Sequence, residues 1–173
     1  MIDTKLVILE GLPATGKTTT SQFLQIQLER NGHNAEWVHE VADPHPTIFI
    51  PDGLALDEQY KKIALENWAD FTEKALRNPE EIHIVDSAVF QCHIFLFLLN
   101  NAPTTDLEHF IREIFSIVAP LKPCLFYLYS CPVECQAPEG KKIKIFSPPG
   151  AYGGARGKQQ SPPSGKGSEK SSQ

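Results

Sequence analysis

Short apolar runs alternate with amphipathic stretches through roughly the first 130 residues of the chain. A short apolar run is typical of a buried strand, and apolar residues spaced three or four apart are typical of one helix face. The apolar runs predict strands at residues 6–9, 35–39, 82–85 and 124–129. The helical spacings predict helices at about residues 17–30, 60–75, 88–99 and 106–118.

The order of these elements predicts the fold class. Strands that alternate with helices favour a parallel sheet with helices on both faces, because each crossover packs a helix against the sheet. We therefore expect an α/β fold, a three-layer sandwich around a parallel sheet with about four recognisable strands. Residues 41–54 contain Pro44, Pro46, Pro51 and Gly53, which predict a loop.

The pattern ends near residue 135, and a different composition follows. Residues 136–173 are rich in Pro, Gly, Ser and Lys, and no aliphatic or aromatic residue follows Ala155. Such a segment buries too little apolar surface to offset its ordering entropy. We expect one α/β domain over residues 1–135 and a divergent tail over residues 136–173, disordered from about Ser147.

Charge and composition exclude several classes of partner. Residues 1–135 hold 9 Lys or Arg and 19 Asp or Glu, whereas residues 136–173 hold 7 and 2. An acidic body argues against a nucleic-acid surface, which needs clustered cations. The apolar run from Ala88 to Leu99 is too short to span a membrane. Without a secretory signal at the start we expect a cytoplasmic protein with reduced thiols; a dimer is neither predicted nor excluded.

One motif carries specific chemistry. Gly11, Gly16, Lys17 and Thr18 match the phosphate-binding loop, between a predicted strand and a predicted helix. The glycines allow a sharp turn that brings backbone N–H groups to phosphate oxygens, and the helix adds its positive amino end. Lys17 would contact the β- and γ-phosphates, and the Thr18 hydroxyl would ligate Mg²⁺. We predict binding of ATP or GTP with Mg²⁺ by Gly11, Pro13, Ala14, Thr15, Gly16, Lys17, Thr18 and Thr19.

Two acidic residues follow other predicted strands. Asp86 ends the third strand, where a second acidic group would reach the metal or its waters. The alternative is that Asp86 or Ser87 caps the helix that begins at residue 88. Glu40 lies just past the second strand, where a carboxylate would accept a proton from a substrate hydroxyl. The alternative for Glu40 is a solvated loop charge, and we expect structural roles for His39 and His45.

Taken together, these motifs resemble the nucleoside and nucleotide kinases with a phosphate-binding loop, of which thymidylate kinase and the deoxynucleoside kinases are examples. The similar residues are Leu9 to Thr18, His39-Glu40 and Asp86-Ser87, within a span from about Lys5 to Cys135. The resemblance implies a general base at Glu40. Those kinases carry an acidic-Arg pair where this chain has Asp86-Ser87.

The same resemblance extends to a helix and to a lid. Gln59, Tyr60, Asn67 and Trp68 lie on a helix similar to the substrate-lining helix of those kinases, although we expect Tyr60 and Trp68 in the core. Residues 127–134 look like the entry to an arginine-bearing lid, yet only Arg156 follows Arg112. Without the family's fifth strand, the sheet edge beside residues 124–129 would be open.

We therefore expect a small-molecule kinase in which Lys17, Glu40 and Asp86 act on an ATP·Mg phosphoryl group and a small acceptor, a nucleoside or nucleotide among the candidates. One alternative is a nucleoside triphosphate hydrolase or switch, although the Asn-Lys-x-Asp guanine motif is absent. The other is a nucleotide-binding but inactive remnant, truncated or frame-shifted after the fourth strand. The identity of the acceptor is left open by the sequence.

Overall fold

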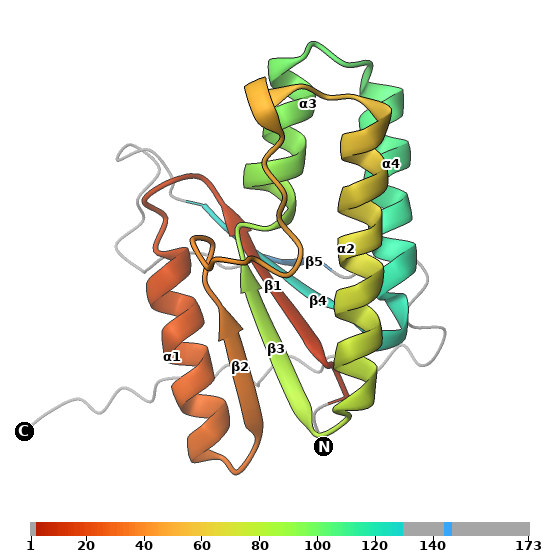
Figure 1. Ribbon diagram of the computed structural model, residues 1–173. Coiled ribbons are helices and arrows are strands. Elements are labelled where there is room, and N and C mark those ends of the chain that lie inside the picture. The colour runs from red at the N-terminus through yellow and green to blue at the C-terminus, as the bar shows by residue number, and fades with distance from the viewer. Residues whose placement is uncertain (1–2, 130–143, 147–173) are drawn as a thin grey trace, which may run out of the picture.

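The computed structural model describes residues 3–129 and 144–146 (Figure 1). The helices predicted from the spacing of apolar residues appear with small shifts at their ends. The strands are β1 (Leu6–Gly11), β2 (Asn34–Val38), β3 (Glu81–Asp86), β4 (Cys124–Leu128) and β5 (Lys144–Phe146). The α-helices are α1 (Lys17–Arg30), α2 (Glu58–Arg77), α3 (Phe95–Leu99) and α4 (Thr104–Val118). Short helical turns lie at η1 (Asp52–Leu54), η2 (Val89–Ile94) and η3 (Ala119–Leu121).

The strands form one sheet in the order β2-β3-β1-β4-β5, and the first four are parallel. The register pairs Leu9 of β1 with Asp86 of β3, and Gly11 with Leu128 of β4. The loops that follow β1, β2 and β3 therefore leave the sheet at the same edge (Figure 1). The predicted α/β class with a parallel sheet is confirmed.

Helices lie on both faces of this sheet, with α1 on one side and α2 and α4 on the other (Figure 1). Two buried clusters follow from the alternation of side chains along the strands. Leu6 and Ile8 of β1 belong to the cluster under α2 and α4, whereas Val7 and Leu9 belong to the cluster under α1. Tyr60 and Trp68 are almost fully buried, so their expected place in the core is confirmed.

The expectation of an open edge beside β4 is wrong over part of that strand. Strand β5 pairs antiparallel with β4, and Tyr127 lies opposite Lys144 while Leu125 lies opposite Phe146. The side of β4 from Leu125 to Tyr127 is therefore covered by β5, a strand that the composition of the tail did not predict. The division at residue 135 and the disorder expected from Ser147 concern mostly residues outside the described part.

The segment predicted as a helix from residue 88 to residue 99 has two parts. It begins as a π-helix, η2, and continues as the short helix α3. A π-turn widens the helix and is frequent at functional sites. In residues 3–129 and 144–146, no helix has the length and apolar character that crossing a bilayer requires.

Candidate functional site

Residues 11–18, from the last residue of β1 to the second residue of α1, form the glycine loop. Gly11 has φ 150°, and a Cβ atom at this position would lie 2.2 Å from the carbonyl oxygen of Leu128. Gly16 has φ 88° and stands immediately before α1 in the left-handed region. Both positions therefore require glycine, one for close approach to β4 and one for the turn into the helix.

The Lys17 side chain folds back under the glycine loop. Its Nζ atom donates a 3.1 Å hydrogen bond to the carbonyl oxygen of Leu12, which also accepts a 2.8 Å bond from Thr15 Oγ1. Lys17 is 6% exposed, so a positive charge is held at the inner side of the loop. No side chain caps the start of α1, which leaves its first N–H groups directed toward the same space.

The other predicted loop residues are more open to solvent. Pro13, Ala14 and Thr19 are exposed, and Thr18 is half-buried. Ala14 has a positive φ of 62°, which is uncommon for a residue with a side chain. The loop thus presents backbone at its surface, while Lys17 lies underneath.

Asp86 lies at the same edge and is fully buried. Its Oδ1 atom accepts a 2.9 Å hydrogen bond from the backbone N–H of Glu40, and its Oδ2 atom has no partner among the described residues. Burial raises the pKa of Asp86 and the charge of Glu40 adds to the shift, whereas the backbone hydrogen bond from Glu40, the charge of His39 and the side-chain N–H of Trp37 oppose it. The structure thus brings together the two acidic residues that the sequence placed after separate strands.

The alternative role of Asp86 or Ser87 as a helix cap is not seen. Neither Asp86 nor Ser87 accepts a hydrogen bond from the first N–H groups of η2, and Ser87 Oγ has no partner in the described part of the chain. Glu10 takes this role instead, because its Oε1 atom accepts a 2.7 Å hydrogen bond from the backbone N–H of Val89.

Glu10 is the residue whose importance the sequence pattern understated. It is fully buried, and burial raises its pKa to about 7, although hydrogen bonds from Val89 and Phe90 and the charge of Lys17 oppose the shift. Its Oε2 atom has no partner in residues 3–129 or 144–146. The sequence feature that could have indicated this role is a charged residue placed directly between an apolar run and the first glycine of the loop.

Cys92 of η2 lies near the carboxylates of Glu10 and Glu40. Burial raises the pKa of its thiol to about 12, and the negative charges of Glu10 and Glu40 add to the shift. Its Sγ atom donates to the carbonyl oxygen of Ser87 at 3.5 Å, so the thiol is held in protonated form. Glu10, Glu40 and Cys92 therefore share one electrostatic environment beside the glycine loop.

His39 and His45 have the structural roles expected from the sequence. The Nδ1 atom of His39 accepts from the backbone N–H of Val41, and His45 Nδ1 accepts from Thr47 and Ile48. Burial lowers the pKa of His45 to about 4, so its imidazole is neutral at pH 7. Both rings organise the loop after β2.

Tyr60 and Trp68 of α2 meet His93 of η2 in the core. Trp68 Nε1 donates a 3.0 Å hydrogen bond to His93 Nε2, so the imidazole proton lies on Nδ1. His93 Nδ1 lies 2.6 Å from Tyr60 Oη and donates this proton to it. Burial lowers the pKa of His93 to about 4, which keeps the ring neutral. Of the other residues expected to line a substrate, Gln59 is exposed and Asn67 is half-buried.

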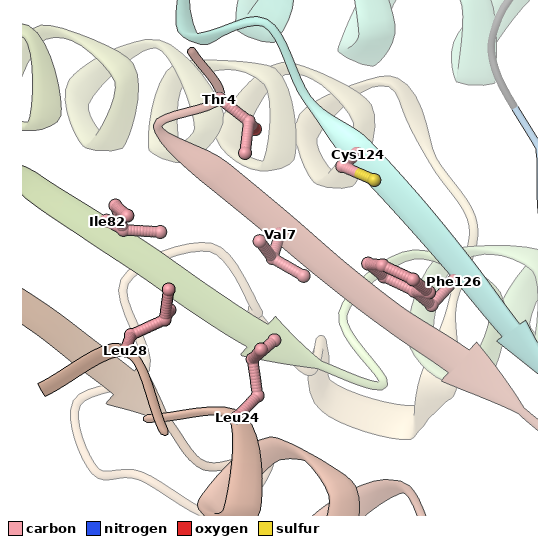
Figure 2. A pocket seen from close by; sticks show the side chains of 7 residues that line it. All are labelled: Thr4, Val7, Leu24, Leu28, Ile82, Cys124 and Phe126. Atoms are coloured by element: carbon pink, nitrogen blue, oxygen red, sulfur yellow. The ribbon is translucent and has the colours of Figure 1, made fainter. Parts of the chain in front are cut away.

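A hollow near the amino ends of the strands is separate from the glycine loop, which lies at their carboxyl ends. It measures about 170 Å³, lies on the α1 face, and is lined by side chains of α1, β1, β3 and β4 (Figure 2). Its lining residues are Thr4, Val7, Leu24, Leu28, Ile82, Cys124 and Phe126. Val7 lies four positions before Gly11, roughly 13 Å along the strand. An apolar lining at that distance offers nothing to a phosphate.

Comparison with known proteins gives no relative from which to transfer a function. No protein-family model matches the chain, and no curated protein is significantly similar to it. The glycine loop and the three buried or half-buried carboxyl groups beside it, those of Glu10, Glu40 and Asp86, make up the candidate site.

Proposed function

We propose that the chain binds a nucleoside triphosphate, ATP in the first instance, through the glycine loop. The observation that carries this proposal is the position of Lys17, whose ammonium group lies under the loop beside the uncapped start of α1. A buried cation next to free N–H groups is suited to phosphate oxygens. Gly11 permits the close approach of the loop to β4, and Gly16 permits the turn into α1, so the two glycines fix the course of the loop backbone.

The residues at this edge also fit a magnesium ion. Asp86 Oδ2 is buried and without a partner among the described residues, and Thr18 offers a hydroxyl on the first turn of α1. Hydroxyl and carboxylate oxygens are ligands that Mg²⁺ prefers. When bound, the ion would neutralise charge on the β- and γ-phosphates. Asp86 and Thr18 are the residues that would hold it.

For the reaction we propose phosphoryl transfer to a small acceptor, with a nucleoside or nucleotide as the leading candidates. Glu40 is the proposed general base, because it is half-buried and its backbone is fixed to Asp86. It would accept the proton of the acceptor hydroxyl as that oxygen bonds to the γ-phosphorus, while the bond from the γ-phosphorus to the bridging oxygen breaks and ADP leaves. Lys17 would stabilise the charge on the transferring group.

Product analysis with radiolabelled ATP, Mg²⁺ and a panel of nucleosides, nucleotides and amino alcohols tests this proposal. Transfer of the label to an acceptor supports the kinase. Release of labelled inorganic phosphate at the same rate with and without every acceptor would instead support a hydrolase. ATP binding without turnover would support an inactive nucleotide-binding protein.

A further inference from the structure

A second cluster of ligand-type side chains lies away from the glycine loop, on strands β2 and β3. Parallel pairing places Glu36 of β2 directly opposite His83 of β3. Glu81 and His83 lie two positions apart on β3, so both side chains point to the same face. His83 is three positions before Asp86, roughly 10 Å along the strand from the proposed nucleotide site.

His83 is held tightly at the centre of this cluster. It is 5% exposed, and the ring of Phe71 from α2 packs edge-on against it with centroids 5.4 Å apart. Its Nδ1 atom lies 3.0 Å from Glu36 Oε2. Its Nε2 atom has no hydrogen-bond partner in the described part of the chain and lies 3.9 Å from Glu81 Oε2. A buried ring nitrogen without a hydrogen-bond partner is uncommon in folded proteins, and a metal ion on Nε2 would place positive charge between this nitrogen and the Glu81 carboxylate.

The negative charge of the two carboxylates in this cluster also favours a bound cation. Two carboxylates on adjacent strands repel each other unless a cation lies between them. One ligand atom from each of Glu36, Glu81 and His83 lies within 4.8 Å of the others. Ligands around a transition-metal ion are roughly 3–4 Å apart, given metal–ligand distances near 2.1 Å. Glu36 is exposed and Glu81 is half-buried, so both carboxylates have room to turn toward a shared ion.

We propose that Glu36, Glu81 and His83 form a binding site for a divalent transition-metal ion of the zinc type. An imidazole nitrogen with two carboxylate oxygens suits Zn²⁺, whereas Mg²⁺ prefers an all-oxygen shell. The two carboxylates balance the charge of the ion when the imidazole is neutral. The ion ties the edge strand β2 to β3 and is independent of the nucleotide.

The competing interpretation is an ion pair in which a protonated His83 is shared by the two carboxylates. Isothermal titration of the full chain with Zn²⁺, without nucleotide, separates the two. The site predicts one bound equivalent that Glu81→Gln and Glu36→Gln each weaken about 10- to 100-fold, while Glu80→Gln, an exposed neighbour, leaves it unchanged. His83→Gln should abolish this binding, with thermal melting as a check that the variant is folded.

Cysteine thiols are the main competitors for Zn²⁺, so Co²⁺ serves as an optical probe. Nitrogen and oxygen ligation gives visible bands without the near-ultraviolet thiolate band. The proposal fails if no equivalent of Zn²⁺ binds, if Glu81→Gln and Glu36→Gln bind it as tightly as the unmodified chain, or if the Co²⁺ spectrum shows only thiolate ligation.

Discussion

The backbone N–H of Glu40 donates a 2.9 Å hydrogen bond to Oδ1 of Asp86, which joins the loop after β2 to the end of β3. One oxygen of Asp86 therefore fixes the proposed base, and the other remains without a partner among the described residues. The position of Glu40 depends on Asp86, but the position of Asp86 does not depend on the Glu40 side chain.

This relationship separates the two residues experimentally. Glu40→Gln should abolish phosphotransfer and leave ATP·Mg affinity within about twofold, because only a base is removed. Asp86→Asn keeps an acceptor oxygen for the Glu40 N–H, and it should instead weaken the dependence of nucleotide binding on Mg²⁺. Titration calorimetry at several Mg²⁺ concentrations measures both effects. The division of roles is wrong if the two variants lose nucleotide affinity equally.

Glu10 makes stability depend on pH. Its folded pKa is about 7 and its ordinary value is 4.5, so the folded state binds this proton more tightly than the unfolded state does. The protonated group favours folding below pH 4.5, and this contribution is lost as pH rises to about 7, by roughly 3 kcal/mol in all. Without nucleotide, Glu10→Gln should therefore gain stability relative to the unmodified chain as pH rises from 5 to 8.

Urea unfolding of both proteins at each pH measures that difference, in which the contributions of the other titrating groups cancel. A difference that stays constant between pH 5 and pH 8 would show that Glu10 is ionised in the folded state throughout. The pKa assigned to its environment would then be wrong.

The Tyr60–His93–Trp68 contacts predict a stability effect without a change of volume. Tyr60→Phe removes the oxygen that faces His93 Nδ1 and leaves a buried N–H unpaired, which costs about 1–3 kcal/mol. Tyr127→Phe is the matched control, because Tyr127 is half-buried and its side chain makes no hydrogen bond within the described residues. Urea unfolding at pH 7 compares the two. Equal losses would mean that the hydroxyl of Tyr60 is not bonded to His93.

Much of the architecture could be predicted from the spacing of apolar residues. The strand Leu6–Gly11 and the helix Glu58–Arg77 follow from patterns that one short stretch of chain contains. The π-helix η2 could not be predicted, because contacts far apart in sequence shape it. Glu10 holds its first N–H group, and Tyr60 and Trp68 hold His93.

Only part of the candidate site could be predicted from the sequence. The glycine motif identifies Gly11, Gly16 and Lys17 because each type is required within one loop. The link between Glu40 and Asp86 and the cluster at His83 depend on the strand order and on the β2–β3 register. Short apolar runs determine neither of these, so no sequence pattern indicated the cluster.

Binding of ATP·Mg by the unmodified chain and by Lys17→Ala, measured by titration calorimetry, tests the account most directly. Among the described residues Lys17 Nζ donates only to the loop carbonyl of Leu12, so its loss should leave melting nearly unchanged and weaken ATP binding about 10- to 100-fold. Lys74→Ala, an exposed change at the far end of α2, should have no effect on binding. Equal ATP affinity in the unmodified chain and in folded Lys17→Ala would contradict the assignment of the glycine loop as the phosphate site.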